Sequence, residues 1–399
     1  MIKVRWFKNS HEQRNYWLRF GLMRLHGEGR IEYKEYPLST CEEAGFSEEL
    51  VRHEHRHTSV ISVEDGGDSV RCIVDCEDSF LVMDGLIEHA DVYFCAGYNS
   101  QFFRGQHFTS PYSWLKPFEV EAYEQRAAEL VSLYGKWFSR VRPFVPICPS
   151  LSPTAQLSLP ELKVRNAFEK IARRLGESEP WFNAHHSFEQ RYCSLLALRN
   201  APANYDVVLL DTLWGWPRHR YALHQRLQEL GKAGFNIHAH LNWSEPTTWD
   251  GSARAPLERS LFPVLTGQVV NYEKMLAESR LAIFATGFHW GWRSIMALAL
   301  MLGLPMLVDR LLVEPWFDMG RFDIMWNAGT DWDELRSVLQ GVTQEKRLRI
   351  QECNQRAFDQ LLAPEKVAEY FVATALAKEP LAAPPARGQQ RARAAAGRP

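Results

Sequence analysis

The sequence predicts an α/β protein made of two doubly wound domains that face a cleft. Short apolar runs alternate with helical patterns along both halves, which is typical of parallel sheets with right-handed crossovers. The length of 399 residues exceeds what one hydrophobic core usually reaches, so two domains are expected. Four prolines between positions 146 and 160 mark the boundary between the halves.

The first half is expected to contain short strands and two longer helices. The strands are predicted where β-branched and aromatic residues gather, at 2–7, 31–37, 59–63, 70–74, 92–94 and 141–149. Apolar residues at helical spacing predict a helix at 16–25. A second helix is predicted at 119–138, where acids come early and basic residues late, as the helix dipole favours.

The second half alternates strands and helices more regularly. The run at 206–211 is continuously apolar between its two aspartates, which is typical of a buried parallel strand. Further strands are predicted at 236–241, 281–285, 304–308 and 324–326. Helices are predicted at 162–174, 219–233, 269–279, 292–302, 333–340 and 344–361, and glycines at 234 and 303 end two of them.

These patterns divide the chain into four parts. We expect a first Rossmann-like domain at 1–150, a linker with an interdomain helical segment at 151–200, a second Rossmann-like domain at 201–376 and a disordered tail at 377–399. The last twenty residues carry four arginines and no acid, so the formal charge of −2 hides an acidic body of −6. The tail is read as a solvated segment or as a weak attraction to an anionic membrane surface.

The composition of the chain limits the classes of protein to which it can belong. A nearly neutral chain is not expected to be a dedicated nucleic-acid binder. No run of eighteen apolar residues predicts a membrane span, and no signal-peptide pattern follows the first strand. The seven cysteines form no CxxC pair. We therefore expect a reduced, cytoplasmic protein, with the inner face of the membrane as a second location if the tail binds there.

The most informative segment spans 281–310 and reads strand, glycine-rich loop, helix, strand. Gly287 and Gly291 let the loop backbone approach a ligand closely, and Arg293 and Ser294 stand where the helix begins. These features indicate an anion site, suited to a nucleotide diphosphate. The alternative is a plain strand–helix–strand crossover whose glycines only ease the turn. The spacing matches neither the dinucleotide fingerprint nor the Walker motif.

Several motifs of this half together resemble exostosin-like glycosyltransferases over about residues 206–376. They are Tyr272 to Ser279, then Gly287 to Ser294, then Ala297 to Pro305, then Asp309, and then Glu314-Pro-Trp-Phe317. The resemblance implies a GT-B fold of two Rossmann-like domains, with a nucleotide sugar held mainly by the C-terminal one and no bound metal. It also implies transfer of a sugar to a glycan or a lipid-linked acceptor, in surface polysaccharide or glycoconjugate synthesis.

The resemblance implies which residues bind the nucleotide-sugar donor. Expected donor-binding residues are Arg218, Gly287, Arg293, Ser294, Asp309, Arg310 and Glu314. Many GT-B enzymes carry a glutamate in the donor helix that binds the ribose, and this helix has no acid. Asp309 or Glu314 is therefore expected to replace it. For Arg218 the alternative is ordinary charge on a helix surface.

Two residues are candidates for the base that sugar transfer needs. A carboxylate or an imidazole must take the proton of the acceptor hydroxyl as the new bond forms. Asp75 ends a predicted strand and leads the candidates, with His289 of the glycine-rich loop second. The alternatives are a solvated turn at 75–78, with Asp78 or Ser79 capping the next helix, and a packing role for His289.

Asp331 and Asp333 spell a DxD pattern, which binds metal in another class of glycosyltransferase. Here Glu334 lies three residues after Asp331 and an apolar helix follows, so a capping box is the preferred interpretation. Trp292 and Trp316 fall after strand ends, where a ring can stack on a sugar or base or simply pack in a loop.

Three functions remain open from the sequence. The first is a metal-independent glycosyltransferase with a nucleotide-sugar donor. The second is a nucleotide-sugar 2-epimerase of the same architecture, which needs no acceptor. The third is a non-catalytic, transferase-like scaffold that binds glycan.

Overall fold

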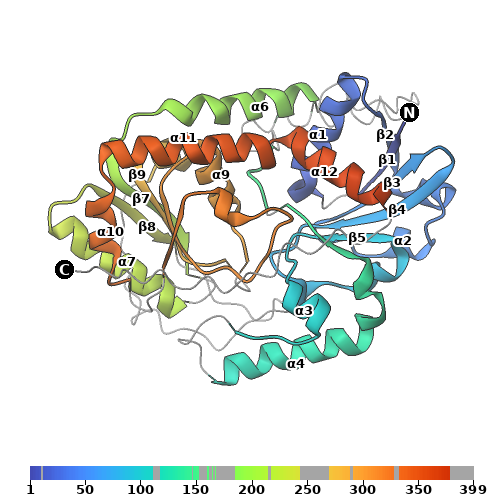
Figure 1. The fold of residues 1–399 in the computed structure, drawn as a ribbon, viewed down its shortest axis with the longest axis horizontal. Coiled ribbons are helices and arrows are strands. Elements are labelled where there is room, and N and C mark those ends of the chain that lie inside the picture. The colour runs from blue at the N-terminus through green and yellow to red at the C-terminus, as the bar shows by residue number, and fades with distance from the viewer. Residues whose placement is uncertain are drawn as a thin grey trace.

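The computed structural model describes residues 1–9, 12–110, 117–145, 147–151, 185–213, 217–242, 269–287, 291–327 and 332–377, with positions 160, 164 and 167. Two sheets lie beside each other, with α11 and α12 running along one side of the pair (Figure 1). The first sheet has six strands and the second has five. The chain is therefore a mixed α/β protein, as expected. The predicted division at 150, 200 and 376 stays a prediction.

The first sheet is mixed and not wholly parallel. Its strands are β1 (Lys3–Lys8), β2 (Glu32–Pro37), β3 (Thr58–Asp65), β4 (Asp68–Asp75), β5 (Val92–Cys95) and β6 (Val141–Pro143), in the order β2-β1-β3-β4-β5-β6. β3 is antiparallel to both of its neighbours. The doubly wound expectation is corrected here because Gly66 and Gly67, with φ of 60° and 107°, close β3 and β4 into a tight hairpin.

The second sheet is wholly parallel. Its strands are β7 (Tyr205–Thr212), β8 (Ile237–Asn242), β9 (Ser279–Phe284), β10 (Met306–Asp309) and β11 (Ile324–Asn327), in the order β11-β10-β9-β7-β8. The chain moves outward from β7 to β8 and then returns to β9 on the other side of β7. Ligands of open parallel sheets bind at such a reversal, beyond the carboxyl ends of the strands.

Most predicted helices are present with shifted ends. The helices are α1 (Tyr16–Gly27), α2 (Glu49–Arg52), α3 (Ser100–Gly105), α4 (Pro117–Tyr134), α6 (His186–Leu196), α7 (Pro217–Lys232), α8 (Tyr272–Ala277), α9 (Ser294–Leu302), α10 (Leu335–Gly341), α11 (Gln344–Leu361) and α12 (Pro364–Ala377). The helix expected at 269–279 is shorter because Ser279 already belongs to β9. The helix expected at 162–174 and the tail lie almost wholly outside the described residues.

The two sheets share one hydrophobic core. A continuous cluster of buried side chains includes Trp6 and Phe94 of the first sheet, Leu209 and Phe284 of the second, and Phe371 of α12. α9 is apolar after Ser294, and its residues from Met296 to Leu302 are all buried. The sheets are therefore joined by packing as well as by the chain.

The last helix lies against the first sheet. α12 packs on α1, β3 and β4, although the sequence groups it with the C-terminal domain. The contact with α1 is close at Gly21, where an added Cβ would lie 1.9 Å from the carbonyl oxygen of Pro364. The indole of Trp17 also donates to the carbonyl of Leu362 at 2.7 Å. α12 thus ties the end of the chain to its beginning.

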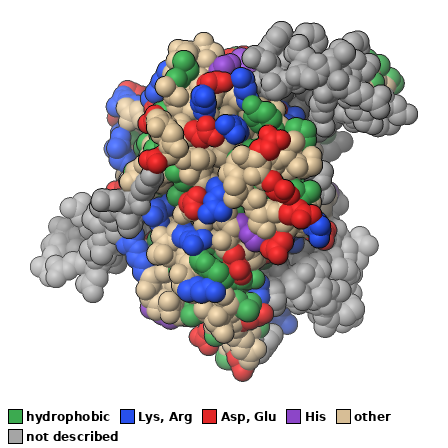
Figure 2. All heavy atoms as spheres, turned by 90° about the vertical axis from the view of Figure 1, so that its right-hand side faces the viewer, with side chains coloured by type: hydrophobic (Ala, Val, Ile, Leu, Met, Phe, Trp, Pro, Cys, Tyr) green, Lys and Arg blue, Asp and Glu red, His purple; other side chains and the backbone are tan. Residues whose placement is uncertain are grey.

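The outer face of the first sheet carries both signs of charge. Figure 2 shows basic and acidic side chains intermixed on this side of the molecule. Ion pairs join strand residues of the first sheet, such as Arg5 with Glu64 at 2.8 Å and Lys34 with Glu32 at 2.9 Å. Across the described residues, no helix combines the length and apolar character needed to cross a membrane.

We expect Gly21→Ala to destabilise the protein by about 1–3 kcal/mol, because the methyl group has to displace the backbone of α12. Urea unfolding followed by circular dichroism measures the change. Gly27→Ala is the matched control, since it lies in the same helix with nothing within 4 Å of an added Cβ. Equal stability of the two variants would contradict this account of the contact.

Candidate functional site

A cavity of about 190 Å³ lies at the carboxyl end of the second sheet, beside the reversal between β7 and β9. Both sheets contribute to its wall. The lining residues are Arg14, Asp78, Ile147, Arg220, Gly287, Trp292, Arg293 and Ser294. This is the place where the topology predicts a ligand.

Asp211 holds together the second-sheet side of the cavity. It is the second-to-last residue of β7, directly before Thr212, and it is 2% exposed. Its Oδ1 accepts hydrogen bonds from Arg220 Nη1 and, at 3.1 Å, from Arg293 Nη2. Burial alone would raise the pKa of Asp211, but the two guanidinium charges outweigh it and hold the pKa below its ordinary value.

Arg220 connects β7 to the loop after β9. Its Nη2 donates to the carbonyl of Thr286 at 3.0 Å, while Nη1 is held by Asp211. The residue is 1% exposed, and burial lowers its pKa to about 10 even though Asp211 opposes the shift. Only a carboxylate this close makes a buried arginine tolerable.

Several donors at the cavity are left without acceptors. Within the described structure, the buried Nε of Arg220 and the buried Nε1 of Trp292 have no hydrogen-bond partner. Arg293 is the N-cap residue of α9 and makes no side-chain cap hydrogen bond. Buried polar groups are nearly always paired, and an uncapped helix start attracts anions. The second-sheet side of the cavity is therefore suited to an anion rich in acceptor atoms.

The first-sheet side of the cavity is built by Arg14 and the loop after β4. Arg14 Nη1 donates to the carbonyl of Cys76 at 3.2 Å, to Glu77 at 3.3 Å and to Asp78 at 3.0 Å. Burial raises the pKa of Glu77 to about 7 and also raises the pKa of Asp78, against the effect of Arg14. This loop places a carboxylate that can change its protonation state beside the cavity.

Backbone contact joins the two sides. A Cβ added at Gly291 would lie 2.1 Å from the carbonyl oxygen of Asp78. Only glycine therefore allows the loop after β9 to lie this close to the loop after β4. The amide of Gly287 donates to the carbonyl of Gly291 at 3.1 Å and closes the glycine-rich loop on itself.

Gly287, Arg293 and Ser294 line the cavity. Their role in binding the donor stays a prediction. Asp309 lies behind the cavity, 2% exposed, with its carboxylate occupied. Asp309 accepts from the amide of Thr286, from His219 Nε2 and from Asn327 Nδ2, each at 2.8 Å. It joins the ends of β9, β10 and β11 to α7 and does not line the cavity.

The other predicted donor residues are absent from the cavity lining. Arg218 and Arg310 are exposed. Glu314 accepts from the amide of Ser100 at 3.1 Å and joins the loop after β10 to α3. His289 lies outside the described residues. A donor-binding role for these four residues stays a prediction.

Asp75, the leading candidate for the base, is buried at the end of β4. It is 2% exposed, and its two oxygens accept from Tyr93 Oη at 2.6 Å and from the amide of Glu77 at 2.9 Å. Burial raises its pKa to about 6. The structure brings Asp78 to the cavity instead, three residues further along the chain. The role of Asp75 as a base stays a prediction.

Arg14, Asp211 and Arg220 were not selected as site residues from the sequence. One signal points to Arg220 rather than Arg218, because Arg220 shares a helix face with Leu223 and Leu227, which are buried. Arg14 follows an irregular stretch of the first half and carries no local signal. Its place depends on the packing of the two sheets.

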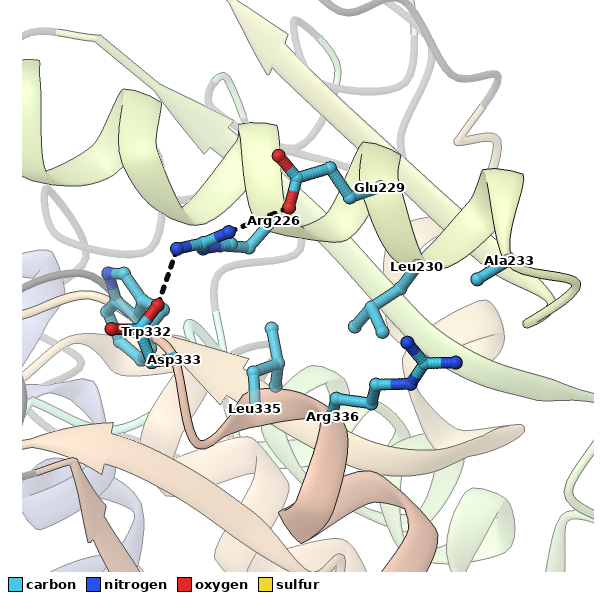
Figure 3. A pocket seen from close by; sticks show the side chains of 8 residues that line it. All are labelled: Arg226, Glu229, Leu230, Ala233, Trp332, Asp333, Leu335 and Arg336. Atoms are coloured by element: carbon cyan, nitrogen blue, oxygen red, sulfur yellow. Dashed lines mark hydrogen bonds and ion pairs between the residues drawn. The ribbon is translucent and has the colours of Figure 1, made fainter.

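The DxD residue Asp333 lies at a second cavity, between α7 and α10 (Figure 3). Arg226 pairs there with Asp333 at 2.5 Å and with Glu229 at 2.9 Å. α10 begins at Leu335, two residues later than predicted, and the side chain of Glu334 makes no capping hydrogen bond. Asp331 lies outside the described residues, so the capping box stays a prediction. Among the described residues, no group of three or more His, Cys, Asp and Glu is placed to hold a metal ion.

Trp292 lines the main cavity, whereas Trp316 stacks on Tyr370 of α12 with ring centroids 4.3 Å apart. Trp292 is 2% exposed at the cavity wall, and Trp316 packs on α12. All seven cysteines are free, and five of them are buried.

No family model matches the chain, and no curated protein matches it by sequence. Among solved structures, Anabaena HepE in complex with UDP-glucose is similar with a TM-score of 0.33 and 12% identity, over 94% of this chain and 99% of that one. A mutant flavo di-iron protein from Thermotoga maritima follows with a TM-score of 0.21 and 12% identity, over 73% of this chain and 64% of its own. These TM-scores do not place the chain in the fold of either protein.

We expect Asp211→Asn to cost about 3–5 kcal/mol of unfolding free energy, because Arg220 stays buried without its counter-charge. The lowered pKa of Asp211 means that its contribution is present above the ordinary carboxyl pKa of about 4 and is lost as the pH falls. The variant should therefore lose part of the acid dependence of stability. Asp206→Asn on the same strand is the control, since its half-buried pair with Arg280 is worth less than about 1 kcal/mol. Urea titrations at several pH values measure both, and a loss no larger than the control's would contradict the prediction.

Proposed function

We propose that the chain is a glycosyltransferase that moves a sugar from a nucleotide-sugar donor to a hydroxyl of a glycan or a lipid-linked acceptor. Surface polysaccharide or glycoconjugate synthesis is the proposed setting. One observation carries the proposal: a cavity at the reversal of a parallel sheet has unpartnered hydrogen-bond donors and arginines on one wall and a carboxylate on the other.

The donor wall suits a diphosphate. Arg220 and Arg293 share the carboxylate of Asp211 and line the cavity, so this wall offers guanidinium donors. The start of α9 adds backbone N–H groups, and Ser294 is exposed beside them. Phosphate oxygens carry negative charge and accept several hydrogen bonds each, which matches both features.

The opposite wall suits the acceptor. As the new bond forms between the acceptor oxygen and the sugar carbon, the bond from that carbon to the phosphate oxygen breaks and its electron pair leaves with the diphosphate. The acceptor hydroxyl gives its proton to a base, and Asp78 is the carboxylate among the described lining residues. Its pKa, raised by burial, favours accepting a proton. Arg293 and the start of α9 stabilise the charge of the leaving diphosphate.

The same cavity can serve neighbouring chemistries, which the products distinguish. A 2-epimerase changes the nucleotide sugar without an acceptor, and a scaffold binds glycan but no nucleotide. Product analysis with and without acceptor therefore belongs in every activity assay.

We expect Arg293→Ala to weaken nucleotide binding by roughly 10- to 100-fold and to abolish transfer, because a charged hydrogen bond to phosphate is lost. Thermal shift with UDP, GDP, CMP and dTDP identifies the nucleotide, and calorimetry measures the affinity. Arg336→Ala is the control, an exposed arginine that lines the second cavity. Circular dichroism checks that both variants fold.

No binding of any of these nucleotides by the wild-type protein at millimolar concentration would overturn the proposal. Equal affinities of Arg293→Ala and Arg336→Ala would remove Arg293 from the donor site.

A further inference from the structure

The loop after β4 contains a buried carboxylate that the proposed function does not use. Glu77 directly precedes Asp78, is 6% exposed and does not line the cavity. Moving a carboxylate out of water is costly, and a buried ion pair seldom stabilises a protein more than apolar side chains of similar size do. The place of Glu77 beside the proposed base points to a role in the site.

Glu77 joins three segments that are distant in the sequence. Its Oε2 accepts a hydrogen bond from Arg14 Nη1 at 3.3 Å, and its Oε1 lies 2.8 Å from Arg56 Nε. Arg14 belongs to the short turn at Gln13–Asn15 between β1 and α1, and Arg56 directly precedes the segment that enters β3. One side chain thereby ties the loop after β4 to both of these segments.

Arg14 carries this arrangement on to Asp78. The Nη1 that donates to Glu77 also donates to Asp78 Oδ1 at 3.0 Å and to the carbonyl of Cys76 at 3.2 Å. A nitrogen that serves three acceptors takes its position from all of them. The position of Arg14 therefore depends on Glu77, and the orientation of Asp78 at the cavity depends on Arg14.

The strength of this arrangement depends on the charge of Glu77. Four charged groups face it, namely Arg14 and Arg56 from other segments and Asp75 and Asp78 from its own. Burial and the two carboxylates raise the pKa of Glu77 to about 7, against the effect of the two arginines. Glu77 therefore holds both arginines as an anion above about pH 7 and loses most of this attraction when it is protonated below that pH.

We propose that Glu77 is a positioning residue for sugar transfer: its carboxylate fixes Arg14, and Arg14 holds Asp78 where it takes the proton of the acceptor hydroxyl. This inference rests on the proposed function and adds to it a residue that acts from outside the cavity lining. A base contributes to a reaction only when it is held close to the geometry of the proton transfer.

Glu77→Gln in the full chain tests the role of the charge, because the amide keeps the size and an acceptor oxygen. Turnover is measured as nucleotide release from UDP-glucose, GDP-mannose and dTDP-glucose, with water or maltotriose as the acceptor. At about pH 8 we expect kcat to fall by roughly 10- to 100-fold, because Asp78 is less well placed. The affinity for UDP, GDP or dTDP, measured by calorimetry, should stay the same, since the donor wall is intact.

The pH dependence separates positioning from a purely structural role. Glutamine resembles protonated glutamate, so the ratio of the wild-type rate to the Glu77→Gln rate should be largest above about pH 7 and approach one as the pH falls below it. Arg56→Gln removes a cation that keeps Glu77 ionised, so the rise of the rate should move to higher pH. We expect a shift of about one unit or less, because the Arg56 side chain is 64% exposed. Arg56→Lys should restore most of the wild-type profile.

Glu64→Gln is the matched control. Glu64 lies on β3 and pairs with Arg5 at 2.8 Å, so the same substitution removes an ion pair of the same sheet away from the cavity lining. Neither kcat nor its pH dependence should change in this variant. Melting temperatures show that each variant is folded, and Arg56→Gln, at an exposed side chain, provides the test if Glu77→Gln does not fold.

The outcomes separate the inference from the function on which it rests. A kcat of Glu77→Gln equal to that of the wild type, or a ratio of the two rates that is constant with pH, overturns the role of Glu77 and leaves the proposed function standing. A loss of nucleotide affinity as large as the loss of kcat also overturns it. A wild-type protein that binds nucleotide but releases none from the three donors overturns the inference, and one that binds no nucleotide overturns the proposed function as well.

Discussion

The buried carboxylate of Asp211 and the two arginines that share it hold the candidate site in shape. Arg220 comes from α7 and Arg293 from the start of α9, and both reach the end of β7 to pair with Asp211. Arg220 then continues to the carbonyl of Thr286 after β9. A buried arginine is tolerable only with its counter-charge, so the positions of both helices depend on this one side chain. The two guanidinium groups that Asp211 holds in place both line the cavity.

A second buried carboxylate, Asp309, ends β10, which is separated from β7 by β9. Asp309 accepts three hydrogen bonds and joins β9, β10, β11 and α7. Its oxygens are occupied within the protein, which is why it holds the loops and does not line the cavity. The acids at the ends of β7 and β10, the two strands on either side of β9, thus have different roles. One balances the arginines of the cavity wall, and the other fixes the loops behind that wall.

The cavity is shared between the sheets because the two halves are packed tightly against each other. α12 lies on the first sheet through the close contact at Gly21, and the loops after β4 and β9 touch at Gly291. One hydrophobic core runs through both sheets. These contacts bring Arg14 and Asp78 of the first sheet opposite Arg293 of the second. The proposed donor and acceptor walls face each other for this reason.

Most strands and helices, and the position of Arg293 and Ser294 at the start of α9, could be predicted from the sequence. Those features follow from local periodicity and from the chemistry of a helix start, which neighbouring residues set. Tertiary structure decided which side chains reach the cavity. Asp78 replaces Asp75 and Arg220 replaces Arg218 there, and Arg14 joins from the other sheet. Which polar side chain is buried against which partner depends on packing between segments far apart in the chain, and no local pattern encodes it.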